Sequence, residues 1–232
     1  LTRAPHSTSP WENELPDQIT PPKAGALPIG EDPVWQKENG SKGTVTPYRN
    51  FEAIRNSDNS SGVAPPDSDG DIGPSHYFAM VNNSFQIFNR AGTSLYGPAG
   101  STTIWDGWAG YYGQSISDPI VLYDEQADRW FASVMTTSTY GGLYYILCAV
   151  STTSSPTGTW YRYAWSFSSL PDYPKYGIWP DGYYLGLNRT GDDVLVLERS
   201  VMLTGGSADM VSFDNPGKPV PNNTTFNCVL PS

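Results

Sequence analysis

Three similar seven-residue segments recur at equal spacing along the middle of this chain. They read HYFAMVN from His76, RWFASVM from Arg129 and GYYLGLN from Gly182, so their starts lie 53 residues apart in both intervals. Each begins with a polar or small residue, continues with two aromatic residues and then alternates. Coincidence is one explanation; the stronger one is an internal structural repeat of about 50 residues.

A repeat of roughly that length built from strands is typical of the four-stranded antiparallel blades of a β-propeller. Only 16% of the residues are charged, 23 are Gly and 21 are Pro, so we expect an all-β fold with little helix. The second unit predicts strands PIVLYD, RWFASVMTT, LYYILCAVS and WYRYAWSF, and the third predicts YGIWP, GYYLGLN and DVLVLERSVML. The first unit predicts HYFAMVN and SFQIFNRAG, followed by a less regular Gly-rich passage. In the EQAD turn of the second unit we expect an ion pair between Asp124 and Arg129.

The chain divides into two parts by composition. Residues 1–65 are rich in Pro, Asn and Ser, with isolated apolar residues such as Phe51, and we expect them to extend over the core. Residues 66–232 are then the N-terminal part of a β-propeller, roughly its first three to four blades. Three units cannot close a ring, and the next repeat would start at about residue 235. Because an open half-ring exposes strand edges, we expect the C-terminal remainder of the same propeller as a partner.

Four segments of the chain resemble a group of secreted, largely uncharacterised β-propeller proteins of bacteria and fungi. These segments are GDIGPSHYFAMVNNSFQIFNRAG, DPIVLYDEQADRWFAS, AVSTTSSPTGTWYRYAW and DYPKYGIWPDGYYLGLN. The resemblance implies further blades but no settled activity. A weaker likeness links SSPTGTW to the Asp-box of sialidase-type propellers, with Ser154, Gly158 and Trp160 retained and Pro156 where Asp belongs. The Asp-box is a structural hairpin, so this likeness implies no sialidase chemistry.

Charge and sequence motifs indicate the compartment and exclude some partners. The net charge of −10 argues against binding of nucleic acid or an anionic membrane, both of which need a positive field. The first residues contain no initiator Met and look like a processed end, which favours a secreted, extracellular glycoprotein. Sequons that could carry glycans include Asn59, Asn82, Asn188, Asn222 and Asn223. Sequence alone does not decide whether Cys148 and Cys228 pair.

A short acidic run precedes the first repeat. Asp67, Asp69 and Asp71 alternate around Gly70, and hard cations such as Ca²⁺ prefer several such oxygens. The pattern therefore predicts a calcium site that stabilises the protein, with a solvated acidic turn as the alternative.

Equivalent positions of successive blades converge at one mouth of a propeller. There we expect Asp71, His76, Asp118, Asp172, Tyr173, Lys175 and Asp181. Converging carboxylates with Tyr and Lys suit general acid–base catalysis or a sugar or cation site. Capping of turns is the alternative role for Asp118 and Asp181.

A Gly-rich loop carries the third candidate group, four aromatic residues suited to stacking on sugar faces. These are Trp105, Trp108, Tyr111 and Tyr112, for which burial against a neighbouring blade is the alternative. Two functions remain open. The first is an extracellular binding or adhesion module for carbohydrate, and the second is a carbohydrate-active enzyme, a glycoside hydrolase or lyase, with its site at the mouth.

Overall fold

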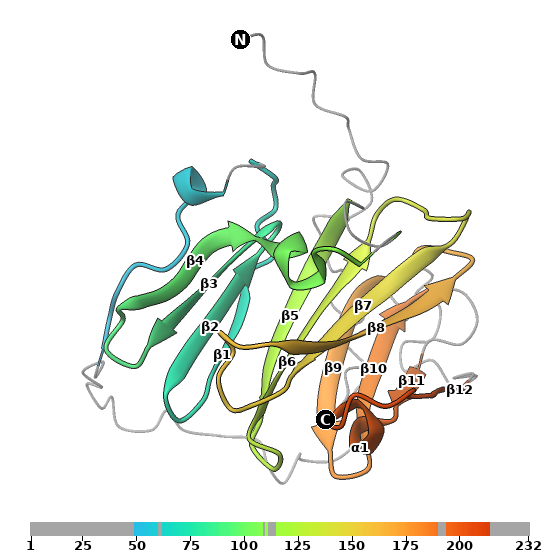
Figure 1. The fold of residues 1–232 in the computed structure, drawn as a ribbon. Coiled ribbons are helices and arrows are strands. Elements are labelled where there is room, and N and C mark those ends of the chain that lie inside the picture. Colours follow the sequence, from blue (N-terminus) through green and yellow to red (C-terminus); the bar gives the residue numbers. More distant parts are fainter. Residues whose placement is uncertain (1–48, 60–61, 109, 111–114, 190–193, 214–232) are drawn as a thin grey trace, which may run out of the picture. The chain divides into compact units, whose positions relative to one another are not determined.

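The computed structural model describes residues 49–59, 62–108, 110, 115–189 and 194–213, all within one compact unit, Pro47–Ser232. This part of the chain is almost entirely β-structure, as the composition predicts. It contains twelve strands in three separate four-stranded antiparallel sheets, which follow one another from cyan to orange in Figure 1. Helices are limited to two 3-10 turns, η1 (Asn56–Asp58) and η2 (Ser101–Trp105), and one turn of α-helix, α1 (Arg199–Met202).

Each sheet is a simple meander, because its strands pair in chain order. Sheet 1 contains β1 (Asp69–Ile72), β2 (His76–Val81), β3 (Ser84–Asn89) and β4 (Ser94–Gly100). Sheet 2 contains β5 (Ile116–Asp124), β6 (Arg129–Thr136), β7 (Tyr144–Ser151) and β8 (Trp160–Phe167). Sheet 3 contains β9 (Asp172–Trp179), β10 (Gly182–Asn188), β11 (Val194–Leu197) and β12 (Met210–Phe213).

The 53-residue spacing marks the second strand of each sheet, since β2, β6 and β10 begin at His76, Arg129 and Gly182. The four strands expected in the second unit are β5 to β8. Two expectations were wrong in detail. The DGDI segment is a strand, β1, and the long strand expected in the third unit ends at Leu197, where the chain turns into α1.

Sheet 2 lies between the other two sheets and is buried on both faces. Alternate residues of β6 point to opposite sides: Trp130, Ala132 and Val134 belong to the core shared with sheet 1. Phe131 and Met135 belong to the core shared with sheet 3. This is the two-fold alternation of a strand, with an apolar residue at almost every position because both faces are covered.

The aromatic pair of each repeat forms the contact between sheets. The third residue of the first segment, Phe78, packs on the second residue of the next, Trp130, with ring centroids 5.9 Å apart. In the same way Phe131 packs on Tyr183, at 4.8 Å. One interface geometry is therefore used twice, and the repeated aromatic pair in the sequence encodes it.

The segment before sheet 1 covers the face of that sheet opposite to sheet 2. Phe51 lies against Tyr77 and Phe88, with ring centroids 6.1 and 5.1 Å away. The amide of Asn59 donates a hydrogen bond to the backbone oxygen of Asn82, and its side-chain oxygen accepts one from Ser84. Residues 1–48 of the expected N-terminal segment lie outside the described residues.

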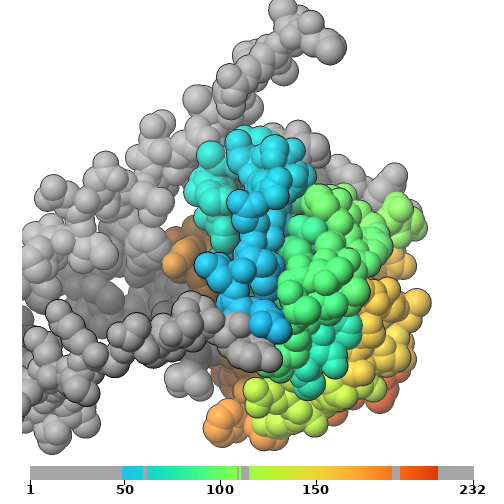
Figure 2. All heavy atoms as spheres, turned by 90° about the vertical axis from the view of Figure 1, so that its left-hand side faces the viewer, coloured from blue at the N-terminus to red at the C-terminus, as the bar shows by residue number. Residues whose placement is uncertain are grey.

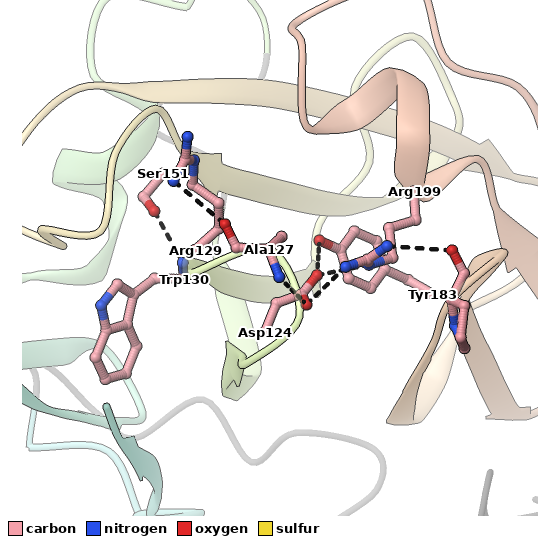
Figure 3. Close-up of polar contacts among 8 residues, drawn as sticks. Asp124, Ala127, Arg129, Trp130, Ser151, Tyr183 and Arg199 are labelled. Atoms are coloured by element: carbon pink, nitrogen blue, oxygen red, sulfur yellow. Dashed lines mark hydrogen bonds and ion pairs between the residues drawn. The ribbon is translucent and has the colours of Figure 1, made fainter. Parts of the chain in front are cut away.

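A buried ion pair joins sheet 2 to sheet 3, and it is not the one expected from the sequence. Asp124 is 0% exposed and accepts hydrogen bonds from Nε and Nη2 of Arg199, at 2.6 and 2.8 Å (Figure 3). The hydroxyl of Tyr183 donates a third, at 2.9 Å. The expected pair with Arg129 was wrong, because the Arg129 guanidinium instead donates to the backbone oxygens of Ala127 and Asp128.

Candidate functional site

The first strands of the three sheets, β1, β5 and β9, bring their leading polar residues together at one end. Burial raises the pKa of Asp118, the hydrogen bond from Ser117 opposes this, and the charges of Asp67 and Asp172 raise it further. The ammonium of Lys175 lowers it. Charges from three different sheets therefore act on one carboxyl group. We call this group of residues, Asp67, Asp118, Asp172 and Lys175, the inner cluster.

Two of these carboxylates are held by asparagine amides at equivalent positions of the repeat. Asn82 follows β2 and donates to Asp67 at 2.5 Å, and Asn188 ends β10 and donates to Asp172 at 3.0 Å. The side-chain oxygen of Asn82 also accepts the backbone N–H of Asp118, at 3.0 Å. Both asparagines are the seventh residue of their segment, so the repeat places the same amide–carboxylate contact in sheets 1 and 3.

The backbone is strained where each sheet starts. Asp67, Asp118 and Tyr173 have φ values of +39°, +50° and +54°, a region that residues other than Gly rarely occupy. Asp118 and Tyr173 also precede proline, which restricts them further. Such strain is often found at functional sites. It follows from neither composition nor periodicity, and sequence analysis missed it.

The carboxylates of the predicted calcium site face different partners. Asp67 contacts Asn82, whereas Asp69 and Asp71 accept the backbone N–H groups of Val121 and Tyr123 in β5, at 2.7 and 2.8 Å. Among the described residues no group of three His, Cys, Asp or Glu side chains could hold a metal ion. The acidic run therefore links sheet 1 to the free edge of β5. The calcium site stays a prediction.

Two of the expected mouth residues lie at the other end of the strands. His76 follows the β1–β2 turn and Asp181 lies in the β9–β10 turn, where it accepts the hydroxyl of Tyr184 at 3.0 Å. Burial lowers the pKa of His76. Neither side chain reaches the inner cluster, because β1 and β9 run away from it before each turn. Tyr173 does lie there, and its ring is 4.3 Å from Nζ of Lys175.

Trp105 and Trp108 are the two candidate stacking residues that lie within the described part of the aromatic loop. Trp105 is 1% exposed and belongs to the core between sheets 1 and 2, so its predicted role in stacking on a ligand was wrong. Trp108 packs partly against the same core and carries the guanidinium of Arg162 over its ring, at 5.5 Å. Tyr111 and Tyr112 lie outside the described residues.

Three of the sequons have asparagine amides that donate hydrogen bonds within the fold. Asn82 is 1% exposed and its Nδ2 donates to Asp67 and to the backbone oxygen of Pro65, so a glycan there would replace those bonds. Asn59 is 8% exposed and also uses its Nδ2. Asn188 is half-buried against Asp172. Asn222 and Asn223, like Cys228, lie outside the described residues.

Cys148 is completely buried, with Sγ 3.5 Å from the hydroxyl of Tyr176.

Comparisons with known proteins add no identity. No family model, no curated protein and no solved structure matches this chain. The resemblance to secreted propellers therefore stays a prediction based on the motifs. None of the helices in the described ranges is long and apolar enough to cross a membrane.

Proposed function

We propose that this chain is a non-catalytic extracellular module of a larger β-propeller and that it binds or adheres to carbohydrate. Three four-stranded sheets that reuse one aromatic interface support the propeller architecture. The low charge density and the net charge of −10 support an uncharged polar ligand rather than a nucleic acid.

One observation favours binding over catalysis: the acidic residues of β1 and two carboxylates of the inner cluster already accept hydrogen bonds from other groups of the fold. Asp69 and Asp71 cap backbone N–H groups of β5, and Asp67 and Asp172 each accept an asparagine amide. A general acid or base must exchange a proton with its substrate, which competes with such bonds. We therefore assign these four carboxylates a structural role near the ends of the strands.

The far face of sheet 3 supports the existence of further sheets. Residues opposite one another in antiparallel strands share a face, which places Tyr184, Val196 and Val211 in one row. Val211 is 55% exposed, and on the same face Phe213 and Trp179 are 51% and 60% exposed. Tyr184 is also the third residue of its segment, the position from which Phe78 and Phe131 contact the next sheet. The partner we propose for this face is the next sheet of the same propeller.

This partner face has its own test. The 232-residue chain should self-associate with rising concentration in analytical ultracentrifugation, and Val211→Lys with Phe213→Lys should make it monomeric without lowering its melting temperature. A wild-type chain that stays monomeric at the highest concentration reached would contradict the proposal that this face binds another sheet.

A second function is favoured by one residue, Asp118. Its pKa is raised by burial and by neighbouring carboxylates, and its backbone is strained, both of which are features of catalytic acids. The alternative is a glycoside hydrolase or lyase in which Asp118 donates a proton.

The binding module and the enzyme are distinguished by whether the polysaccharide is cleaved. The protein is incubated with a panel of soluble polysaccharides, and both binding and reducing-end formation are measured. Binding without product supports the module. Product that disappears in Asp118→Asn, while binding remains, supports the enzyme and contradicts our proposal.

A further inference from the structure

We infer that the cleft between sheet 1 and the outer hairpin of sheet 2 is a binding site for a neutral sugar. The inference rests on the proposed function and assigns its ligand to one surface. The cleft has a volume of about 430 Å³, within the usual range for small-molecule sites. Figure 2 shows this side of the molecule, where the green surface of sheet 1 meets the yellow surface of the β7–β8 region.

Elements of two different sheets form the walls of the cleft. The β7–β8 hairpin contains the Asp-box-like SSPTGTW segment, and it forms one wall through residues 156–160. Strand β4 forms the opposite wall through Tyr96, and η2 with the residue after it, Asp106, closes one side. Because the hairpin belongs to sheet 2 and β4 to sheet 1, the cleft exists only where the two sheets meet.

An exposed aromatic ring offers a flat surface for a sugar. Tyr96 is 41% exposed, and its ring is stacked on Phe85 with centroids 5.5 Å apart and an angle of 15° between the planes. This stacking fixes the orientation of the ring before any ligand binds. Trp160 adds a second, half-buried ring, held edge to face by Phe78 at 6.0 Å. The C–H faces of pyranose rings pack well on such surfaces.

Polar groups at the rim suit hydroxyl groups. Thr157 and Thr159 are exposed on the hairpin, where their hydroxyls are hydrogen-bonded to those of Ser155 and Thr152, and Asp106 is exposed on the other side. Arg162 donates from Nη1 to the backbone oxygen of Asp106, at 2.8 Å, and rests on the ring of Trp108. A guanidinium has five N–H donors, so Arg162 retains donors for a ligand while its position is fixed.

The charge of the cleft selects the class of sugar. Asp106 and Arg162 are the two charged residues of its lining, and their charges cancel. An anionic glycan would also meet the net charge of −10 of the whole chain. The site therefore fits a neutral mono- or oligosaccharide.

The test uses affinity electrophoresis of the 232-residue chain in gels with neutral polysaccharides (β-glucan, xylan, galactomannan) or an acidic one (polygalacturonate). We expect retardation by a neutral polysaccharide, and a roughly tenfold weaker affinity in Tyr96→Ala because a stacked ring contributes about that factor. Arg162→Met, at an exposed position, should also weaken binding several-fold. Tyr140→Ala is the matched control, since this 45% exposed ring lies between β6 and β7 and does not line the cleft.

The outcomes separate the site from the function. Binding that is unchanged in both cleft variants places the ligand elsewhere and overturns this inference, but leaves the proposed binding function standing. Retardation only by polygalacturonate overturns the neutral class. The absence of retardation in every gel contradicts the proposed function itself. Unchanged melting temperatures of the variants show that lost binding is not lost folding.

Discussion

The buried contact between Asp124 and Arg199 offers the most direct test of how sheets 2 and 3 are held together. Arg199→Met keeps the volume and the apolar stem of the side chain but removes both charged hydrogen bonds to Asp124. The carboxylate is 0% exposed, so it would be left in the interior with only the Tyr183 hydroxyl and the backbone N–H of Ala127 as donors.

Removing one partner of a buried ion pair typically costs about 3–5 kcal/mol. For a domain of this size we therefore expect the melting temperature to fall by about 10 °C. The free energy of unfolding is measured by urea titration monitored by tryptophan fluorescence. Arg55→Met is the control, because the ion pair of Arg55 with Glu52 has side chains 63% and 74% exposed and should contribute less than about 1 kcal/mol.

The destabilisation caused by Arg199→Met should also depend on pH, in a direction that follows from the pKa of Asp124. Burial raises the pKa of Asp124, but hydrogen bonds from Arg199 and Tyr183 outweigh it and hold the folded pKa below the ordinary value. The stabilisation is therefore complete above the unfolded pKa of about 4 and is lost as the pH falls through the folded pKa. In Arg199→Met the unpaired buried carboxyl has a raised pKa instead, so the cost of the substitution should shrink between pH 7 and pH 4.

Two results would contradict this reasoning. One is a loss in Arg199→Met no larger than that in Arg55→Met. The other is a cost that stays constant between pH 7 and pH 4. The double variant Asp124→Leu with Arg199→Met should recover part of the stability, because it leaves no buried charge.

Two further predictions concern the faces of the sheets. Phe51→Ala removes a half-buried ring from Tyr77 and Phe88 and should lower the free energy of unfolding by about 2 kcal/mol, with Phe51→Leu recovering roughly half; an unchanged thermal melt would mean that this segment does not cover sheet 1. Burial between sheets 2 and 3 raises the pKa of the Cys148 thiol to about 12, so iodoacetamide at pH 8 should modify it only in denaturant, and peptide mass spectrometry that finds modification in the native protein would contradict that burial.

The parts of the fold that depend on patterns within short sequence segments could be predicted. The nearly continuous apolar run in RWFASVM indicates a strand that is covered on both faces. The same pattern at a constant interval indicates one such strand in each sheet. Short polar strands carry no such pattern, so the DGDI segment of β1 was interpreted as part of a calcium site or of an acidic turn rather than as a strand. For the same reason β12 was not anticipated.

The candidate site was predictable only in part. The idea that Asp118 and Asp172 converge depends on the repeat alone, and both act in the same inner cluster. Asn82 and Asn188 were interpreted as sequons, although their shared seventh position in the segment could have suggested a common structural role. No sequence pattern predicts the cleft beside Tyr96, because β4 and the β7–β8 hairpin that form its walls are distant in the sequence.

By itself the sequence determined the class of structure and the presence of three similar units, because strands show in the local pattern of apolar residues and a repeat shows in a constant interval. Only the tertiary structure decided which charges meet. Asp124 lies 75 residues from Arg199 and five from Arg129, and nothing in the local pattern favours the distant partner. Packing of sheet 3 on sheet 2 excludes water from Asp124, and in that environment the carboxylate requires the guanidinium that the neighbouring sheet brings to it.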